Sequence, residues 1–132
     1  MNESVLDASA MLALLNGEQG HETVLALLPN SVIGTVNLAE VVSKLCERGL
    51  PLDSAWEAVE SIGMETVPFS NDQARRAGAL RPLTKQFGLS LGDRCCLALA
   101  WDRGADAVTA ERHWDGRVEA AAEVRVVRIR GA

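Results

Sequence analysis

The sequence has few cysteines and histidines, and their placement excludes several classes of protein. The three cysteines are an odd number, and Cys95 and Cys96 are adjacent, which is a poor basis for a disulfide framework. No Cys-x-x-Cys pair or Cys/His cluster has the spacing of a zinc site. We therefore expect a protein of the reducing cytoplasm.

Long apolar runs are missing as well. No stretch approaches the roughly 18 consecutive apolar residues of a transmembrane helix, so we expect no membrane span. The chain begins Met1-Asn2-Glu3 without a basic region or a long apolar stretch, so we expect no secretory signal.

Two kinds of catalytic motif are absent. The chain contains no Gly-x-x-x-x-Gly-Lys and no Gly-x-Gly-x-x-Gly segment for binding nucleotides. Its two histidines, His21 and His113, form no recognisable catalytic triad. What the chain does have is 48% hydrophobic residues in a length of 132, which is enough for one packed core, so we expect a single domain spanning 1–132.

Charge is distributed unevenly along the chain. The net charge of -5 argues against a simple electrostatic coat on nucleic acid. Residues 1–66 carry two basic and ten acidic side chains, whereas residues 67–132 carry eleven basic and eight acidic ones. An acidic pocket beside a basic rim would suit a nucleic-acid phosphate chain, although any single arginine is more often part of a solvated face.

Short apolar segments alternate with helical patterns. We expect strands at 4–6, 31–34, 65–68, 106–109 and 124–129. We expect helices at 8–15, 21–28, 35–48, 52–62, 71–80 and 90–103, the third of them capped by Thr35. This alternation predicts an α/β fold in which helices cover both faces of a parallel sheet.

Four acidic residues stand at or near the junctions of these elements: Asp7, Glu40, Asp93 and Glu111. Asp7 and Glu111 follow predicted strands, and the carboxyl ends of such strands converge on one crevice in an open parallel sheet. Several carboxylates in one crevice repel each other unless hard cations lie between them. The pattern therefore favours a phosphodiester-cleaving site that depends on magnesium or manganese.

The first two acids each have a structural alternative. Asp7 would also cap the helix that follows it, and both roles can hold for one residue. Glu40 has apolar neighbours at helical spacing, which suggests an inward side chain, whereas charged residues are mostly exposed. An inward Glu40 needs a partner, because burying a lone carboxylate is costly.

The other two acids have alternatives as well. Asp93 follows Ser90 by three residues and could complete a capping box. Gly92 costs a helix about 1 kcal/mol relative to alanine, which makes sense if the backbone there approaches another group closely. Glu111 could be an exposed loop acid, and Asp115 is a rival for its role.

Four segments, taken in order, carry a resemblance to a known family. They are Val-Leu-Asp-Ala-Ser-Ala at 5–10, Asn-Leu-Ala-Glu-Val at 37–41, Leu-Ser-Leu-Gly-Asp-Arg-Cys-Cys-Leu-Ala-Leu-Ala at 89–100, and Val-Thr-Ala-Glu-Arg-His-Trp at 108–114. Together they closely resemble the PIN-domain ribonucleases, above all the VapC-type toxins of bacterial toxin–antitoxin pairs. The resemblance covers essentially the whole chain.

The resemblance implies a three-layer α/β/α sandwich with a short central parallel sheet. It implies endonucleolytic RNA cleavage with Mg²⁺ or Mn²⁺ as cofactor, leaving 5′-phosphate and 3′-hydroxyl ends. By motif, Asp7, Glu40, Asp93 and Glu111 match the catalytic metal ligands. The family usually has Asp at the fourth position, so Asp115 stays open as an alternative ligand.

The resemblance also implies partners. These are an RNA substrate, a cognate antitoxin protein and commonly a second copy of the chain. The apolar faces of the helices at 8–15 and 35–48 are candidate surfaces for that second copy, with ordinary core packing as the alternative. The side chains expected to contact the substrate are Ser9, Asn37, Ser90, Arg94, Thr109 and Arg112.

Two other functions compete with this interpretation. A phosphoryl-transfer enzyme with Asp7 as nucleophile is disfavoured, because the residue two positions later is Ser9 and the last lysine is Lys85. A non-catalytic PIN-like module that binds RNA or protein is the stronger alternative, because Glu111 departs from the family's Asp. The retention of the other three acids argues against it.

Overall fold

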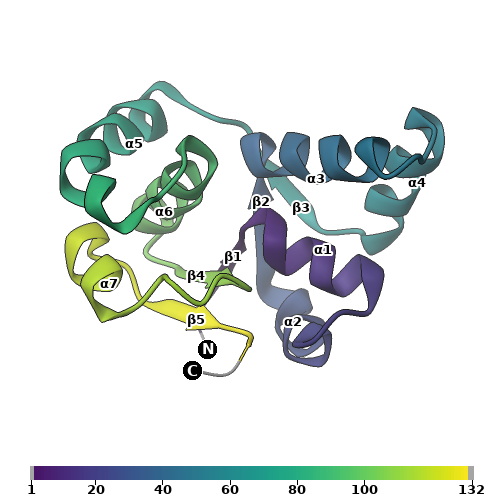
Figure 1. Cartoon of the computed structure of the whole chain (residues 1–132), viewed down its shortest axis with the longest axis horizontal. Coiled ribbons are helices and arrows are strands. Elements are labelled where there is room, and N and C mark those ends of the chain that lie inside the picture. Colours follow the sequence, from purple (N-terminus) through teal and green to yellow (C-terminus); the bar gives the residue numbers. More distant parts are fainter. Residues whose placement is uncertain (1, 131–132) are drawn as a thin grey trace.

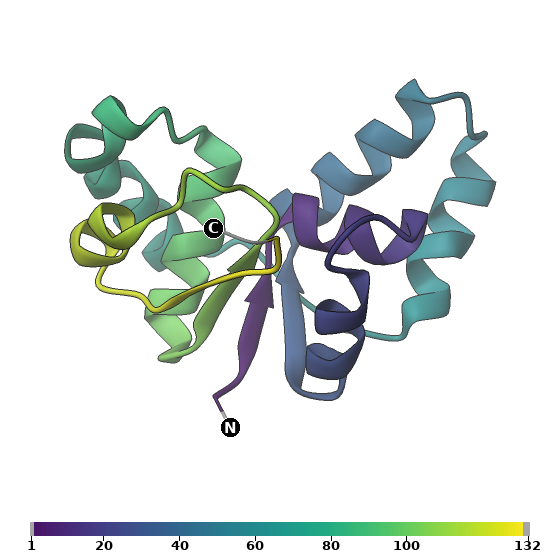
Figure 2. The same cartoon turned by 60° about the horizontal axis from the view of Figure 1, so that its bottom comes forward.

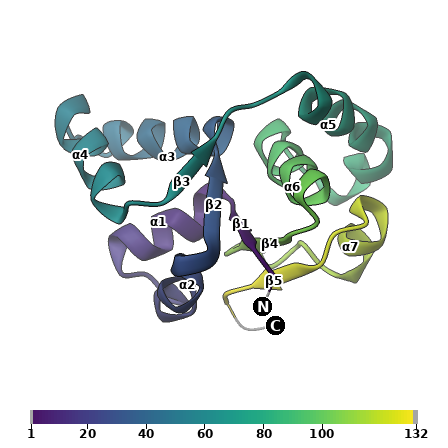
Figure 3. The same cartoon turned by 180° about the vertical axis from the view of Figure 1, so that it is seen from behind.

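Five short strands form one parallel sheet in the order β3-β2-β1-β4-β5 (Figures 1 and 3). The computed structural model describes residues 2–130. The strands are β1 (Ser4–Leu6), β2 (Ser31–Gly34), β3 (Glu65–Val67), β4 (Asp106–Thr109) and β5 (Val126–Arg128). All four strand pairings are parallel.

Helices cover both faces of this sheet, as Figure 2 shows. One layer contains α1 (Ala8–Asn16), α2 (His21–Leu27), α3 (Thr35–Glu47) and α4 (Leu52–Ile62). The other contains α5 (Asn71–Thr84), α6 (Leu91–Arg103) and α7 (Gly116–Ala122), and the 3-10 turns η1 (Leu28–Asn30) and η2 (Lys85–Phe87) follow α2 and α5. The predicted three-layer α/β/α sandwich is confirmed.

Neighbouring residues of β1, β2 and β4 pack into different cores, because side chains alternate across a sheet. Val5, Val32 and Ala107 pack beneath α5, α6 and α7, whereas Leu6, Ile33 and Val108 pack beneath the opposite layer. Full burial of each larger side chain contributes about 1.5–3 kcal/mol. Among the helices of residues 2–130, none is both long enough and apolar enough to cross a membrane.

The strand order reverses at the centre of the sheet. From β1 the chain proceeds to β2 and β3 on one side, and it then returns to β4 and β5 on the other side of β1. The carboxyl ends of β1 and β4 therefore form a topological switch point, the place where open α/β sheets bind ligands. Asp7 directly follows β1 at this point.

The predicted cap of α3 is wrong. Gly34, in an extended conformation, is the N-cap of α3, and Thr35 is already the first helical residue. The Thr35 hydroxyl instead accepts a hydrogen bond from the backbone N–H of Phe69 (3.1 Å) and ties the segment after β3 to the start of α3.

One helix, α5, is longer than predicted, and another, α7, was not predicted. α5 continues through Pro82 to Thr84, because the buried face that contains Ala77 and Leu80 before the proline continues to Thr84 after it. α7 was not predicted, and it begins after Asp115, which caps it. The last strand is also shorter than the predicted span 124–129.

The apolar faces of α1 and α3 lie inside the chain. They form one core with α4, made of Met11, Leu12, Ile33, Leu38, Val41, Leu45, Ala55 and Val59. The expectation that these faces are dimer surfaces is therefore wrong.

Candidate active site

All four predicted acids line one hollow at the switch point. The hollow has a volume of about 280 Å³ and is bordered by Asp7, Glu40, Asp93 and Glu111. These side chains come from four separate parts of the chain: the end of β1, the middle of α3, the first turn of α6 and the segment after β4. Its other polar lining residues are Ser9, Asn37, Lys44, Ser90 and His113.

Asp7 is the most buried of the four acids, with 3% of its surface exposed. It is the N-cap of α1, and its Oδ1 accepts hydrogen bonds from the Ala10 backbone N–H (2.8 Å) and the Ser9 hydroxyl (2.7 Å). Its Oδ2 accepts a third bond from the Thr109 hydroxyl (2.5 Å). Burial raises the pKa of Asp7 to about 7 despite these hydrogen bonds, and the charge of Asp93 adds to the rise.

Glu40 is half-buried and is held by a neutral amide. Asn37 Nδ2 donates to Glu40 Oε1 (2.8 Å) and to the backbone oxygen of Gly92 (3.1 Å). Burial raises the pKa of Glu40, the charge of Asp93 raises it further, and the Asn37 hydrogen bond and the charge of Lys44 oppose the rise.

Asp93 combines the two roles that its sequence context left open. Its backbone N–H donates to the Ser90 hydroxyl (3.1 Å), and its Oδ2 accepts from the Ser90 backbone N–H (2.9 Å), so the capping box is present. The same carboxylate lines the hollow. Gly92 lies directly against Glu40. A methyl group at position 92 would overlap the Glu40 carboxylate.

The fourth acid is the least constrained. Glu111 is exposed, and its Oε2 lies 3.8 Å from Nδ1 of His113, with which it forms an ion pair when His113 is protonated. Asp115 does not line the hollow. It caps α7 and pairs with the Arg117 guanidinium (2.9 Å), which lowers the pKa of Asp115. The structure therefore favours Glu111 over Asp115 as the fourth acid.

Three of the six expected substrate contacts line the hollow: Ser9, Asn37 and Ser90. Thr109 is fully buried behind Asp7, and Arg94 Nη1 donates to the backbone oxygen of Ala77 (3.0 Å), away from the hollow.

Arg112 lies in an adjoining hollow of about 430 Å³, which it shares with Gln19, Ala110 and Arg130. Glu111 and His113 line both hollows and so join them.

Lys44 and His113 were not predicted as site residues. Lys44 stands one helical turn after Glu40, and His113 stands two residues after Glu111, so their spacing to the acids was the available signal.

The donor set suits a hard cation. Carboxylate oxygens are the ligands that Mg²⁺ and Mn²⁺ prefer. Burial is the main cause of the raised pKa values of Asp7 and Glu40, and the charge of Asp93 adds to both; a bound divalent cation would favour the charged form of each carboxylate. Within residues 2–130, no group of three or more His, Cys, Asp or Glu side chains is placed close enough to hold one metal ion.

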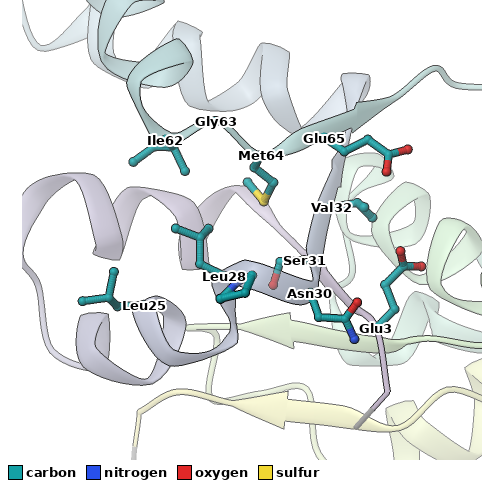
Figure 4. A pocket seen from close by; sticks show the side chains of 11 residues that line it. Glu3, Leu25, Leu28, Asn30, Ser31, Val32, Ile62, Gly63, Met64 and Glu65 are labelled. Carbon is teal, nitrogen blue, oxygen red and sulfur yellow. The ribbon is translucent and has the colours of Figure 1, made fainter.

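A larger hollow of about 480 Å³ lies at the opposite, amino-terminal edge of β2 and β3 (Figure 4). Leu25, Leu28, Ile62 and Met64 contribute much of its lining, and Figure 4 shows Glu3 and Glu65 together at one end of it. Glu3 pairs with Arg103 (2.7 Å), which lowers the pKa of Glu3. This lining suits packing rather than chemistry, so the acidic hollow is the candidate active site.

The PIN domain family matches residues 4–119 of the chain. No match was found among curated proteins. The structure is similar to a toxin–antitoxin complex from Klebsiella pneumoniae, with 19% identity, a TM-score of 0.74 and coverage of 98% of this chain and 100% of the other.

Two further solved structures have similar folds. One is a DNA-bound VapBC from Salmonella typhimurium, with 19% identity, a TM-score of 0.74 and coverage of 98% of this chain and 100% of the other. The second is VapC20 from Mycobacterium tuberculosis, a toxin that cleaves the sarcin–ricin loop, with 20% identity, a TM-score of 0.68 and coverage of 93% and 99%.

Proposed function

Because this chain belongs to the PIN domain family, we propose that it is an endoribonuclease that depends on Mg²⁺ or Mn²⁺ and acts as the toxin of a VapC-type toxin–antitoxin pair. The observation that carries the proposal is the single hollow lined by Asp7, Glu40, Asp93 and Glu111 at the switch point of the sheet. The similar folds of VapBC complexes and of a toxin that cleaves the sarcin–ricin loop support it.

The four acids would together bind two metal ions. Asp7, Glu40 and Asp93 would bind one ion, and Asp93 and Glu111 would help to bind a second. A divalent ion bound in such a site lowers the pKa of a water molecule and stabilises the charge that develops on a phosphodiester.

The protein's own contribution is to orient these acids. The hydroxyls of Ser9 and Thr109 direct the Asp7 oxygens, and burial beneath them limits access of bulk water to that carboxylate. Groups that support a ligand in this way tune both its orientation and its affinity for metal.

Cleavage of a mixed RNA pool tests this proposal. We expect purified protein to cut RNA with Mg²⁺ or Mn²⁺, to stop cutting in EDTA, and to leave 5′-phosphate ends. Asp7→Asn, folded as judged by circular dichroism, should not cut. Full cutting by this variant would contradict the assigned site.

The partners follow from the same proposal. A cognate antitoxin would bind beside the acidic hollow and block it, and its addition should abolish RNA cleavage. The chain would form a homodimer through surfaces other than the buried faces of α1 and α3, and light scattering that detects only monomer at micromolar concentration would contradict this. Cys46, Cys95 and Cys96 are free thiols, which supports a cytoplasmic location.

A non-catalytic PIN-like module that binds RNA or protein is the second candidate. It is favoured by the exposed position of Glu111 and by the absence, within the described chain, of three side chains already grouped around one ion. A folded protein that binds RNA but cuts none with either metal would support this alternative. Glu111→Asp, which restores the family's usual residue, is then the variant to test.

A further inference from the structure

One amide joins the two helices that carry Glu40 and Asp93. Asn37 Nδ2 donates both to Glu40 Oε1 on its own helix α3 (2.8 Å) and to the Gly92 backbone oxygen at the start of α6 (3.1 Å). The Asn37 residue is only 2% exposed. Because α3 and α6 belong to the two different helical layers (Figure 2), the hydrogen bonds of Asn37 connect these layers beside the site.

Gly92 makes this arrangement sterically feasible. A methyl group at position 92 would overlap the Glu40 carboxylate, whereas a methyl group on Gly78, in the interior of α5, would meet no atom within 4 Å beyond its neighbours and the backbone of its own helix. The missing side chain at position 92 therefore allows the Glu40 carboxylate to lie against the first turn of α6.

We propose that Asn37 and Gly92 are positioning residues that hold the Glu40 carboxylate against the start of α6 and so set its place relative to Asp93 before metal binds. Without such a restraint, a flexible glutamate beside another carboxylate would swing away from it, because like charges repel. A neutral amide can restrain Glu40 without cancelling the negative charge that attracts a cation. The inference rests on the proposed function, in which both acids bind metal.

A purely structural role makes a different prediction. If Asn37 and Gly92 served only to join α3 and α6, their substitution would change stability regardless of the residue at position 40. If they act through the carboxylate, their effect on metal binding should disappear once Glu40 is neutral.

Calorimetric titration of the full chain with Mn²⁺ separates these roles. We expect Asn37→Ala and Gly92→Ala each to lower Mn²⁺ affinity about 10- to 100-fold, as loss of supporting groups around a metal site does. In the Glu40→Gln background neither change should lower the affinity further. Gly78→Ala is the matched control and should bind Mn²⁺ as the unmodified protein does.

A rescue variant guards against a folding failure. In Gly92→Ala/Glu40→Asp the shorter carboxylate clears the added methyl group, so this double variant should fold and recover part of the affinity lost by Gly92→Ala. Thermal denaturation of every variant checks that each is folded before titration.

An NMR measurement on Asn37 tests the same contacts without metal. The side-chain NH₂ signals of Asn37 in a ¹⁵N NMR spectrum should shift in Gly92→Ala and in Glu40→Gln, but not in Gly78→Ala. If the unmodified protein binds no Mn²⁺ while these signals shift as expected, the metal site fails and the positioning stands.

Two results would overturn the positioning role. The first is Asn37 NH₂ signals that neither variant moves. The second is weaker Mn²⁺ binding by Glu40→Gln together with one of two observations. Either Asn37→Ala and Gly92→Ala bind Mn²⁺ within about twofold of the unmodified protein, or each loses as much affinity in the Glu40→Gln background as it does alone. In the second case the metal site of the proposed function would stand.

Discussion

The Thr109 hydroxyl donates a hydrogen bond to Oδ2 of Asp7 (2.5 Å), although 102 positions separate the two residues in the chain. It joins the last residue of β4 to the residue after β1, the two strands at which the sheet changes direction. Thr109 Oγ1 also accepts a bond from the Glu111 backbone N–H (2.9 Å). One buried hydroxyl thus orients the most buried acid and the segment that carries the most exposed one.

Thr109→Val should therefore weaken both stability and cleavage. The substitution keeps the shape of the side chain but leaves Asp7 and the Glu111 N–H without this partner, which we expect to cost about 1–3 kcal/mol. The measurements are urea denaturation and the RNA cleavage rate. Thr84→Val is the matched control: Thr84 is equally buried, and its hydroxyl donates to the Leu80 backbone oxygen within α5, outside the acidic hollow. This substitution should lower stability slightly and leave cleavage intact.

Asp7→Asn should be more stable than the unmodified protein at neutral pH in the absence of metal. The folded protein raises the pKa of Asp7 from 3.8 to about 7, so it favours the protonated acid more than the unfolded chain does. The unmodified protein should then lose stability as pH rises from about 4 to about 7, by about 4 kcal/mol at most at 1.36 kcal/mol per pKa unit.

Denaturation midpoints between pH 4 and pH 8 check this sign. The advantage of Asp7→Asn should be near zero at pH 4, should grow through pH 7 and should level off above it. Added Mn²⁺ should raise the midpoint of the unmodified protein and not that of the variant, since a ligand stabilises only the state that binds it. A variant that is less stable at every pH would contradict the burial argument.

Glu111→Gln should change the RNA cleavage rate, whereas Asp115→Asn should change only stability. Glu111 lines the hollow, so we expect its neutralisation to slow RNA cleavage by at least about tenfold while stability stays unchanged. Asp115 caps α7 outside the hollow, and Asn caps a helix about as well as Asp, so this substitution should lower the denaturation midpoint only slightly and leave the cleavage rate unchanged. Cleavage lost in Asp115→Asn and kept in Glu111→Gln would reverse the assignment of the fourth acid.

Arg112→Gln should weaken RNA binding rather than the chemical step. Arg112 lines the hollow that adjoins the acidic one, where a guanidinium would contact the phosphate chain. We expect a higher KM, an unchanged kcat and a salt dependence of binding that is shallower by about one unit in the log–log slope. Arg48→Gln, at the far end of α3 and outside both hollows, is the control and should change none of these.

Much of the fold could be predicted because its signals are local. The run Ser4–Leu6 is short and apolar, and Asp7 after it has the character of a helix cap, so a strand followed by a helix was expected and is present. Predictions failed where packing competes with local preference. Buried Leu80 and Thr84 carry α5 through Pro82, and the start of α3 at Gly34 leaves the Thr35 hydroxyl to bond with Phe69 N–H.

The candidate site was predictable only in part. Asp93 appeared as either a cap or an acid of the site, and the structure shows that it forms the cap while lining the hollow. Asp115 had the right residue type and the right neighbourhood, yet it caps a helix that the sequence did not reveal. Residue type and spacing identify which groups can act, but they do not say which of two nearby acids points toward the others.

The sequence by itself determined the alternation of strands and helices, the burial of the sheet on both faces and the identity of the four acids. These properties depend on residue type and on periods of two to four residues, which are present in the chain before it folds. Only the tertiary structure decided how the acids are held. The Thr109–Asp7 and Asn37–Gly92 hydrogen bonds join residues 102 and 55 positions apart, and such contacts arise only when the two helical layers pack on one sheet.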